Sequence, residues 1–169
     1  FPTLRDEEWK YTNLEPLVKS PLHFTFEPYL NGLTVQKIKP FLFDKLDWNR
    51  LVFVNGIFSR ELSFLSPELK GVRIGNLRDA LHSQSEEMEP YLARHADFKG
   101  QGLTALNTAF IHDGAFLSIP KGRVVEEPIH LLFLSSSGKE KIITQPRNLI
   151  VVGEEGKATV VESYLSLGD

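Results

Sequence analysis

The stretch Ile129-His130-Leu131-Leu132-Phe133-Leu134 decides the fold of this 169-residue chain. Apart from His130, it is apolar at both its odd and its even positions. Because successive side chains of a β-strand point to opposite faces, such a strand is covered on both sides. The stretch therefore predicts a packed interior on one face and a neighbouring layer or a partner on the other.

Similar short apolar runs surround this stretch, and no helical pattern is expected after Gly102. The turn formers Asp113-Gly114, Pro120-Lys121-Gly122 and Gly153-Glu154-Glu155-Gly156 separate several of them. This spacing predicts a sandwich, a barrel or a β-solenoid, and the internal repeat is too faint to select the solenoid. The runs expected to be extended cover residues 109–111, 116–119, 129–134, 141–143, 149–152 and 158–165.

The first half of the chain mixes helical and extended patterns. The clearest is residues 51–59, where two β-prone runs flank Asn55-Gly56, the pair preferred in a type I′ hairpin turn. Residues 23–26 predict a short strand. Three helical segments are expected: Val35, Ile38, Phe41 and Leu42 around Pro40; Leu77, Ala80 and Leu81 capped by Asn76; and Met88, Tyr91, Leu92 and His95 with Pro90 in the first turn.

Lys99-Gly100-Gln101-Gly102 separates the two patterns and is the expected boundary between a mixed domain (1–99) and a β-rich domain (100–169). The predicted fold class is α+β.

Composition excludes several classes of function. The net charge of −3 and a pI near 6.0 give no electrostatic signature for nucleic acid. No run approaches the roughly 18 apolar residues that span a bilayer. Cysteine is absent, which rules out disulfides, thiolate metal ligands and a cysteine nucleophile in this chain. We therefore expect neither a nucleic acid nor a membrane as partner.

The two ends suggest a piece of a longer protein. The chain begins at Phe1 rather than Met, and a strand-like run at 158–165 lies close to its last residue. Such a run would leave an open strand edge. The charged opening does not have the pattern of a secretory signal. The alternative that a leader has already been removed stays open.

Few residues suggest chemistry. The five histidines (His23, His82, His95, His112 and His130) show no metal-ligand spacing. His112 beside Asp113 is the best acid–base candidate, but adjacent strand residues point apart and Asp-Gly is typical of a turn. The turn interpretation is therefore favoured.

Other polar clusters have ordinary interpretations. Gly153-Glu154-Glu155-Gly156-Lys157 is too short and too acidic for a phosphate loop, which favours a β-turn. The cluster Arg5-Asp6-Glu7-Glu8-Trp9-Lys10-Tyr11 is expected to be a solvated face with aromatic anchors, and Glu86, Glu87 and Glu89 to be a solvated helix start. We expect no catalytic, cofactor-binding or metal-binding residue.

Four segments carry a resemblance to a known family. Leu4-Arg5-Asp6-Glu7-Glu8-Trp9-Lys10-Tyr11-Thr12-Asn13-Leu14 closely resembles the N-terminal signature of the SufB/SufD family of iron–sulfur cluster assembly proteins. Residues 51–56, 107–122 and 158–169 are similar to later family segments, in the same order. The Trp-Lys-Tyr opening favours the SufD branch over SufB, which shares the Asp-Gly and Pro-Lys-Gly element.

The resemblance implies a mixed N-terminal domain, a central right-handed parallel β-helix and a C-terminal helical domain. Residues 1–99 would then be the N-terminal domain and 100–169 the first turns of the β-helix. It also implies a non-catalytic scaffold in the SufBCD complex, with SufB and the ATPase SufC as partners, in the cytoplasm or in the plastid stroma of a plant or alga. The family's SufB contact, SufC docking site and proposed cluster residues lie beyond Asp169, so none is carried over and no cofactor is expected here.

Three alternatives stay open. A SufB paralogue is the nearest. A β-solenoid carbohydrate-active enzyme would place several Asp side chains on one solenoid face, whereas Asp113 stands almost alone among apolar strands. A structural partner-binding domain unrelated to iron–sulfur assembly would show no effect on cluster formation when its gene is deleted.

Overall fold

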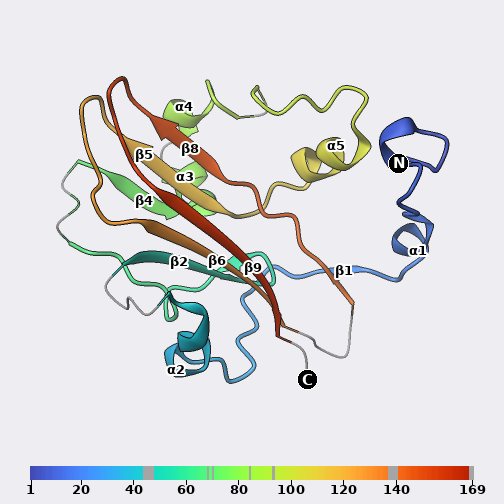
Figure 1. Ribbon diagram of the computed structural model, residues 1–169, viewed down its shortest axis with the longest axis horizontal. Helices are drawn as coiled ribbons and strands as arrows, with labels where there is room; N and C mark the ends of the chain where they lie inside the picture. The colour runs from blue at the N-terminus through green and yellow to red at the C-terminus, as the bar shows by residue number, and fades with distance from the viewer. Residues whose placement is uncertain are drawn as a thin grey trace.

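Two sheets packed face to face form the centre of the molecule, with helices on both outer sides (Figure 1). The computed structural model describes residues 1–43, 48–67, 69, 71–83, 85–92, 94–136 and 141–167. The four-stranded sheet has the order β3-β2-β6-β9, with β2 Asn49–Val54, β3 Ile57–Phe58, β6 Ile129–Ser136 and β9 Val160–Leu167. The three-stranded sheet has the order β4-β5-β8, with β4 Arg73–Asn76, β5 Ala115–Ile119 and β8 Leu149–Val152. A separate parallel pair joins β1 (His23–Phe24) to β7 (Ile142–Ile143).

Each central sheet has an antiparallel strand at one edge and a parallel strand at the other. β2, β6 and β9 run parallel to one another, and so do β5 and β8. The antiparallel strands β3 and β4 lie at one edge of their respective sheets. At the opposite edges lie β8 and β9, which have no further strand beside them in the described part of the chain.

Alternating side chains of the central strands fill three apolar clusters. Leu131 and Phe133 of β6 face Leu117 of β5 in the cluster between the sheets. Leu132 and Leu134 point the other way, toward Ile38. On the far side of the three-stranded sheet, Phe116 packs against Leu77 and Met88. All six residues 129–134 are buried, which confirms that this strand is covered on both faces.

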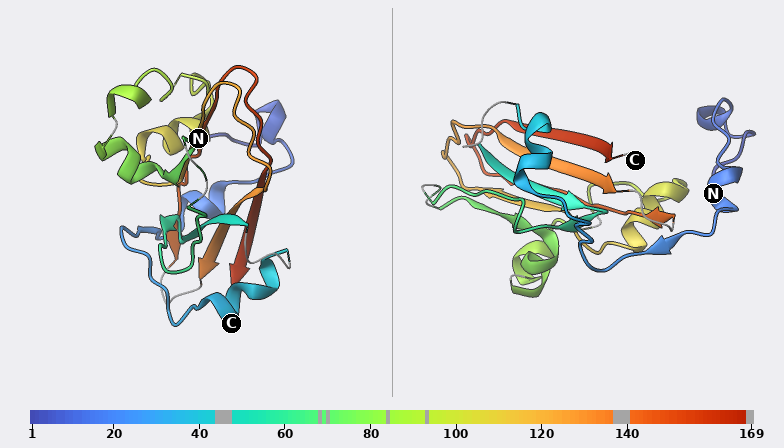
Figure 2. Two further views of the ribbon diagram at one scale, coloured as in Figure 1. Left: turned by 90° about the vertical axis from the view of Figure 1, so that its left-hand side faces the viewer. Right: turned by 90° about the horizontal axis from the view of Figure 1, so that it is seen from below.

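Short helices form the outer layers. α2 (Val35–Ile38) continues into the 3₁₀ turn η2 (Lys39–Phe41) and packs on the four-stranded sheet, whereas α3 (Leu77–Ser83) and α4 (Ser85–Met88) lie on the opposite side of the molecule (Figure 2). The N-terminal segment, with η1 (Glu7–Trp9) and α1 (Glu15–Val18), stands apart from the sheets. The last helix, α5 (Gly102–Ala109), lies against Phe1 and Pro2 at the start of the N-terminal segment.

The predicted hairpin is confirmed. β2 and β3 pair antiparallel with Val54 opposite Ile57. Asn55 (φ 52°) and Gly56 (φ 81°) both have positive φ, as a type I′ turn requires. The strands predicted near residues 23–26, 116–119, 129–134, 141–143, 149–152 and 158–165 and the helix at Leu77 are also confirmed, so the mixed α+β class is correct. Gly168 and Asp169, the end of the segment 158–169, lie outside the described residues.

Two helix predictions are wrong. Residues 102–109 form α5, although no helix was expected there and 109–111 was expected to be extended. The helix predicted to run from Met88 to His95 instead ends at Met88. Pro90 explains this position, since proline lacks an N–H and restricts the residue before it. In contrast, Pro40 is accommodated at the start of η2.

The division at residues 99 and 100 stays a prediction. Strands from both sides of it share one cluster, because β2 pairs with β6 over six residues and β4 pairs with β5 over four.

Candidate functional site

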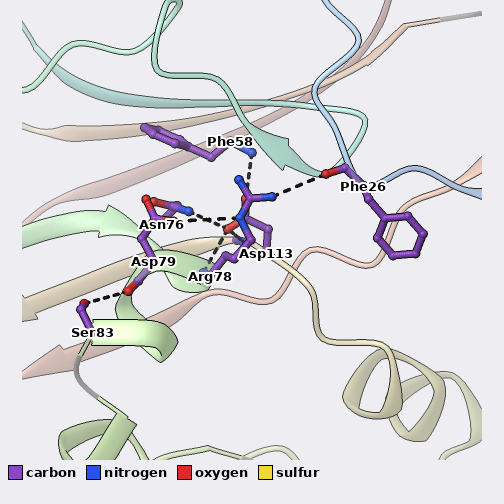
Figure 3. Close-up of polar contacts among 8 residues, drawn as sticks. Phe26, Phe58, Asn76, Arg78, Asp79, Ser83 and Asp113 are labelled. Atoms are coloured by element: carbon purple, nitrogen blue, oxygen red, sulfur yellow. Dashed lines mark hydrogen bonds and ion pairs between the residues drawn. The ribbon is translucent and has the colours of Figure 1, made fainter.

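The carboxylate of Asp113 is the centre of a polar network of four hydrogen bonds (Figure 3). Asp113 is only 1% exposed. Its Oδ2 accepts a hydrogen bond from the Phe58 N–H at 2.9 Å. Its Oδ1 accepts three: from the N–H of Gly114 (2.9 Å), the N–H of Arg78 (3.2 Å) and the Asn76 side-chain amide (3.3 Å).

This network joins segments that are far apart in the sequence. Phe58 belongs to the hairpin, Arg78 to the first turn of α3, and Asp113 is separated from the start of β5 by Gly114 alone. An acidic side chain that accepts from the first N–H groups of a helix satisfies donors that the helix leaves unpaired. Asp113 therefore caps α3 from another segment of the chain.

The prediction that Asn76 caps α3 is thus wrong, because the side chain that accepts from the helix is Asp113. Asn76 is the last residue of β4, and its amide donates to Asp113. Leu77, the first helical residue, donates its N–H to the carbonyl of Gly114 at 2.7 Å. β4 and β5 are antiparallel, so the last residue of β4, Asn76, lies opposite the first residue of β5. Asp113, which comes just before β5, therefore also lies at the start of α3.

The predicted turn at Asp113-Gly114 is also wrong. The chain passes through both residues without a turn and enters β5 directly. Gly114 has φ 153°, and a Cβ on it would lie 2.0 Å from the carbonyl oxygen of Arg147. The N–H of Arg147 donates to the Asp113 carbonyl at 3.0 Å. Glycine is needed here because a second backbone, which leads into β8, passes so closely.

His112 and Asp113 do not form an acid–base pair. The ring of His112 lies edge-on to Phe26, with centroids 5.1 Å apart, whereas the Asp113 carboxylate points toward Phe58 and α3. Arg78 links the two regions by donating to the Phe26 carbonyl at 3.5 Å, and its Nε lies 4.0 Å from Asp79.

His130 is the most buried of the five histidines, at 2% exposure. Its Nε2 lies 3.0 Å from the Ser163 hydroxyl on β9, and its ring meets the edge of Phe43. Burial and, to a lesser extent, the nearby Arg50 guanidinium lower the pKa of His130. His23, His82 and His95 are exposed.

No metal centre emerges from these side chains: within the described ranges, no three His, Asp or Glu residues are grouped so that they could hold a metal ion. The expectation that no residue is catalytic, cofactor-binding or metal-binding stays a prediction.

The remaining candidate segments lie on the surface. Residues 153–156 form the β-turn that was predicted, closed by the Gly156 N–H and the Gly153 carbonyl at 2.9 Å. The cluster at 5–11 is largely solvated, and Tyr11 is 90% exposed. Glu86 and Glu89 are exposed, and the side chain of Glu87 lies outside the described residues.

The sequence interpretation missed an aromatic stack across three neighbouring strands. Phe53, Phe133 and Tyr164 are aligned in register on β2, β6 and β9. Their ring centroids are 4.8 and 4.7 Å apart, with interplanar angles of 13° and 8°. The sequence did contain one signal for this stack: each of the three aromatic residues is followed directly by an aliphatic residue in a β-prone run.

Tyr164 ends this stack at the open edge of the sheet. Its hydroxyl donates to Glu162 at 2.7 Å, and the Asn148 amide donates to the same carboxylate. Partial burial, with the hydrogen bond to Glu162 and the charge of that carboxylate, raises the pKa of Tyr164 to about 12. The β9 edge thus presents a planar, uncharged ring to whatever lies beside it.

The fold and the site define a mixed α/β chain of two packed sheets, in which β2, β6 and β9 run parallel in one sheet and β5 and β8 run parallel in the other. The model of the SufBD protein N-terminal region matches residues 1–131, which is most of the chain, so the chain belongs to the SufBD family. In the described structure no helix is long and apolar enough to cross a membrane.

Two relatives support the family. The chain is 33% identical over 164 residues to an iron–sulfur cluster assembly SufBD family protein of Synechocystis sp., an alignment that covers 97% of this chain and 35% of the relative. It is 32% identical over 105 residues to the iron–sulfur cluster assembly protein SufD of Bacillus subtilis, covering 60% of this chain and 24% of that protein. The chain thus spans only about a third or a quarter of the length of these relatives.

Proposed function

We propose that this chain is the N-terminal part of a non-catalytic scaffold subunit for iron–sulfur cluster assembly. The observation that carries the proposal is the family match over residues 1–131, with 33% identity to a SufBD family protein over 97% of the chain. A scaffold acts through packing surfaces and strand edges, and these are the features that the described residues present. The Trp9-Lys10-Tyr11 opening and the 32% identity to a SufD protein favour a SufD-type subunit.

The proposed architecture is the beginning of a right-handed parallel β-helix. Parallel ladders in both central sheets and the in-register stack of Phe53, Phe133 and Tyr164 support it. Residues 1–99 would supply the mixed domain that covers the first strands, and residues 100–169 the first turns. The open edges of β8 and β9 would then pair with the next turn of a longer chain.

The proposed partners are SufB, through the β-helix, and the ATPase SufC, in the cytoplasm or in a plastid stroma. The test is co-expression of the full-length protein with tagged SufC, with and without SufB. A SufD-type subunit is expected to co-purify with both proteins in a complex that contains one SufB. Failure of the full-length chain to associate with either would overturn the scaffold role.

A further arm of this co-expression, in which SufD is supplied in place of SufB, separates the SufB paralogue. The family match and the Synechocystis relative do not distinguish the two branches. A SufB paralogue would assemble with SufC when SufB is omitted and SufD is supplied. That result would reject a SufD-type role while retaining membership of the family.

A further inference from the structure

The pairing of β9 with β6 shows which backbone groups of β9 point to its open edge. Just before β9, the Thr159 carbonyl accepts from the Ile129 N–H at 2.9 Å, so Thr159 faces β6. Successive residues of a strand direct their N–H and C=O groups to opposite sides. The outward groups therefore belong to the even-numbered residues of β9, which are Val160, Glu162, Tyr164 and Ser166. The last three are exposed, so another strand can reach this edge.

The side chains of these outward residues lie on the face of β9 that is turned toward the three-stranded sheet. Val160 packs against the cluster between the sheets, and side chains two residues apart share a face. In this position Tyr164 completes an aromatic row with Phe53 and Phe133, whose rings are stacked in register. Tyr164 is 61% exposed, so the row ends on a ring that is open to solvent.

The neighbouring row changes from apolar to acidic at β9. Leu51, Leu131 and Glu162 lie in register on β2, β6 and β9. One oxygen of Glu162 accepts from the Asn148 amide at 3.0 Å and the other from the Tyr164 hydroxyl at 2.7 Å. A carboxylate can accept about four hydrogen bonds. Covering this one with an apolar side chain would be costly, whereas a donor at the same position would satisfy it.

The course of the chain indicates what adds to this edge. From β5 onward, the four central strands join the two sheets alternately, β5 and β8 in one and β6 and β9 in the other. Each later strand lies parallel to the earlier strand of its sheet. A following turn with the same course would add a strand to β8 and then one to β9. The Synechocystis relative has the length for such turns, because the chain covers only 35% of it.

We propose that the strand that adds to β9 comes from the following turn of the same polypeptide and carries an aromatic side chain opposite Tyr164 and a hydrogen-bond donor opposite Glu162. This inference rests on the proposed β-helix and specifies the side chains that its next strand needs. Because the pairing is parallel, the required order along the new strand is donor, any residue, aromatic. The aromatic ring would extend the stack, and the donor would make a charge-assisted hydrogen bond to Glu162.

The test supplies such a strand in the 169-residue chain. The sequence Val-Lys-Gln-Thr-Phe-Lys-Ser, which places Gln opposite Glu162 and Phe opposite Tyr164, is appended after Asp169 through a Gly/Ser linker. A linker of about 20 residues has an r.m.s. length of roughly 25 Å, close to the length of an eight-residue strand such as β9. Tethering keeps the effective concentration high. The readout is amide hydrogen exchange by NMR, with sedimentation to establish that the chain is monomeric.

The tethered strand is expected to slow exchange of the Glu162, Tyr164 and Ser166 N–H groups at least about 10-fold relative to a Gly/Ser tail of equal length. Two matched tethers test the side chains. Replacing the Phe of the tether by Leu, or its Gln by Glu, should reduce this slowing at least about 3-fold, through loss of stacking or through repulsion by Glu162.

Variants of β9 assign each preference to one row. In Tyr164→Leu, the tethers with Phe and with Leu should slow exchange equally, and in Glu162→Gln the tethers with Gln and with Glu should do so. Both positions are exposed, so these variants are expected to fold. Tyr11→Leu is the control, because Tyr11 is 90% exposed on the N-terminal segment, and it should retain both preferences.

Three outcomes would overturn the proposal: no slowing by the first tether, equal slowing by all three tethers, or protection that arises from pairing of two copies of the chain through β9. Any of them would leave the scaffold role to be decided by the co-expression test. Failure of the inference is therefore distinguishable from failure of the proposed function.

Discussion

The carboxylate of Asp113 accepts four hydrogen bonds at a buried point where the hairpin, α3 and β5 meet. Three of the donors are backbone N–H groups, so removing the carboxylate leaves them unpaired in a region shielded from water. A buried donor without a partner costs about 1–3 kcal/mol. The function of Asp113 that follows from this geometry is to hold the segments together.

We expect Asp113→Ala to lower the free energy of unfolding by about 3–5 kcal/mol, because several donors lose one acceptor. Asp113→Asn should cost less, since its carbonyl can replace Oδ1 while its amide opposes the Phe58 N–H. Urea unfolding measures both. Asp97→Ala is the control: Asp97 accepts one bond from the exposed Lys99 N–H, and its loss should change stability by less than about 1 kcal/mol. A change in Asp113→Ala no larger than in this control would refute the assignment.

His130 predicts a dependence of stability on pH. Burial and Arg50 lower its pKa in the folded protein, whereas in the unfolded chain it takes up a proton near pH 6.5. As pH falls below about 6.5, the unfolded state therefore binds more protons than the folded state, and stability decreases. Urea unfolding at pH 7.5 and 5.5 should show this loss in the parent chain and a smaller one in His130→Gln. His82→Gln, at an exposed position, should retain the full loss, and equal losses in all three proteins would contradict the prediction.

The contacts of Asp113 and Gly114 also show what the sequence could not reveal. Asp113 is 55 residues from Phe58 and 35 from Arg78, so no local pattern announces that they meet. Asp-Gly is a common turn pair, and only the approach of Arg147 reveals why a glycine is needed at position 114. The sequence correctly argued against an acid–base pair of His112 and Asp113. One reason it gave was a turn at Asp113-Gly114, and that turn does not form.

At the scale of elements, most strands were predictable because their signals are local, whereas no strand was expected at β4 (Arg73–Asn76). Asn55-Gly56 supplies the two positive φ values of the hairpin, and the doubly apolar run at 129–134 announces a strand between two layers.

Helices were harder to predict, because the chain marks them weakly. α5 has no side-chain hydrogen bond at its N-cap, Gln101, and no fully buried residue. It is stabilised by its neighbours, as are most short protein helices. Leu103, Leu106 and Phe110 do recur at i, i+3 and i+7, a helical spacing that the flanking glycines obscured.

At the scale of the molecule, the boundary predicted at residues 99 and 100 separates two kinds of sequence that share one interior. Residues 1–99 supply β2, β3 and β4, and residues 100–169 supply β5, β6, β8 and β9. Each central sheet combines strands from both parts. Leu51 and Phe53, fully buried in the cluster between the sheets, lie beside Leu131 and Phe133 of the second part.

This shared interior predicts that the two parts fold only together. Exposing one buried aliphatic or aromatic side chain costs about 1.5–3 kcal/mol, and a typical domain is stable by only about 5–15 kcal/mol. Losing the six-residue ladder between β2 and β6 should therefore unfold either part. Residues 1–99 and 100–169, produced separately, are expected to give collapsed amide NMR spectra, and an equimolar mixture should regain the dispersion of the uncut chain. A dispersed spectrum from residues 1–99 alone would show instead that the predicted boundary separates independent folding units.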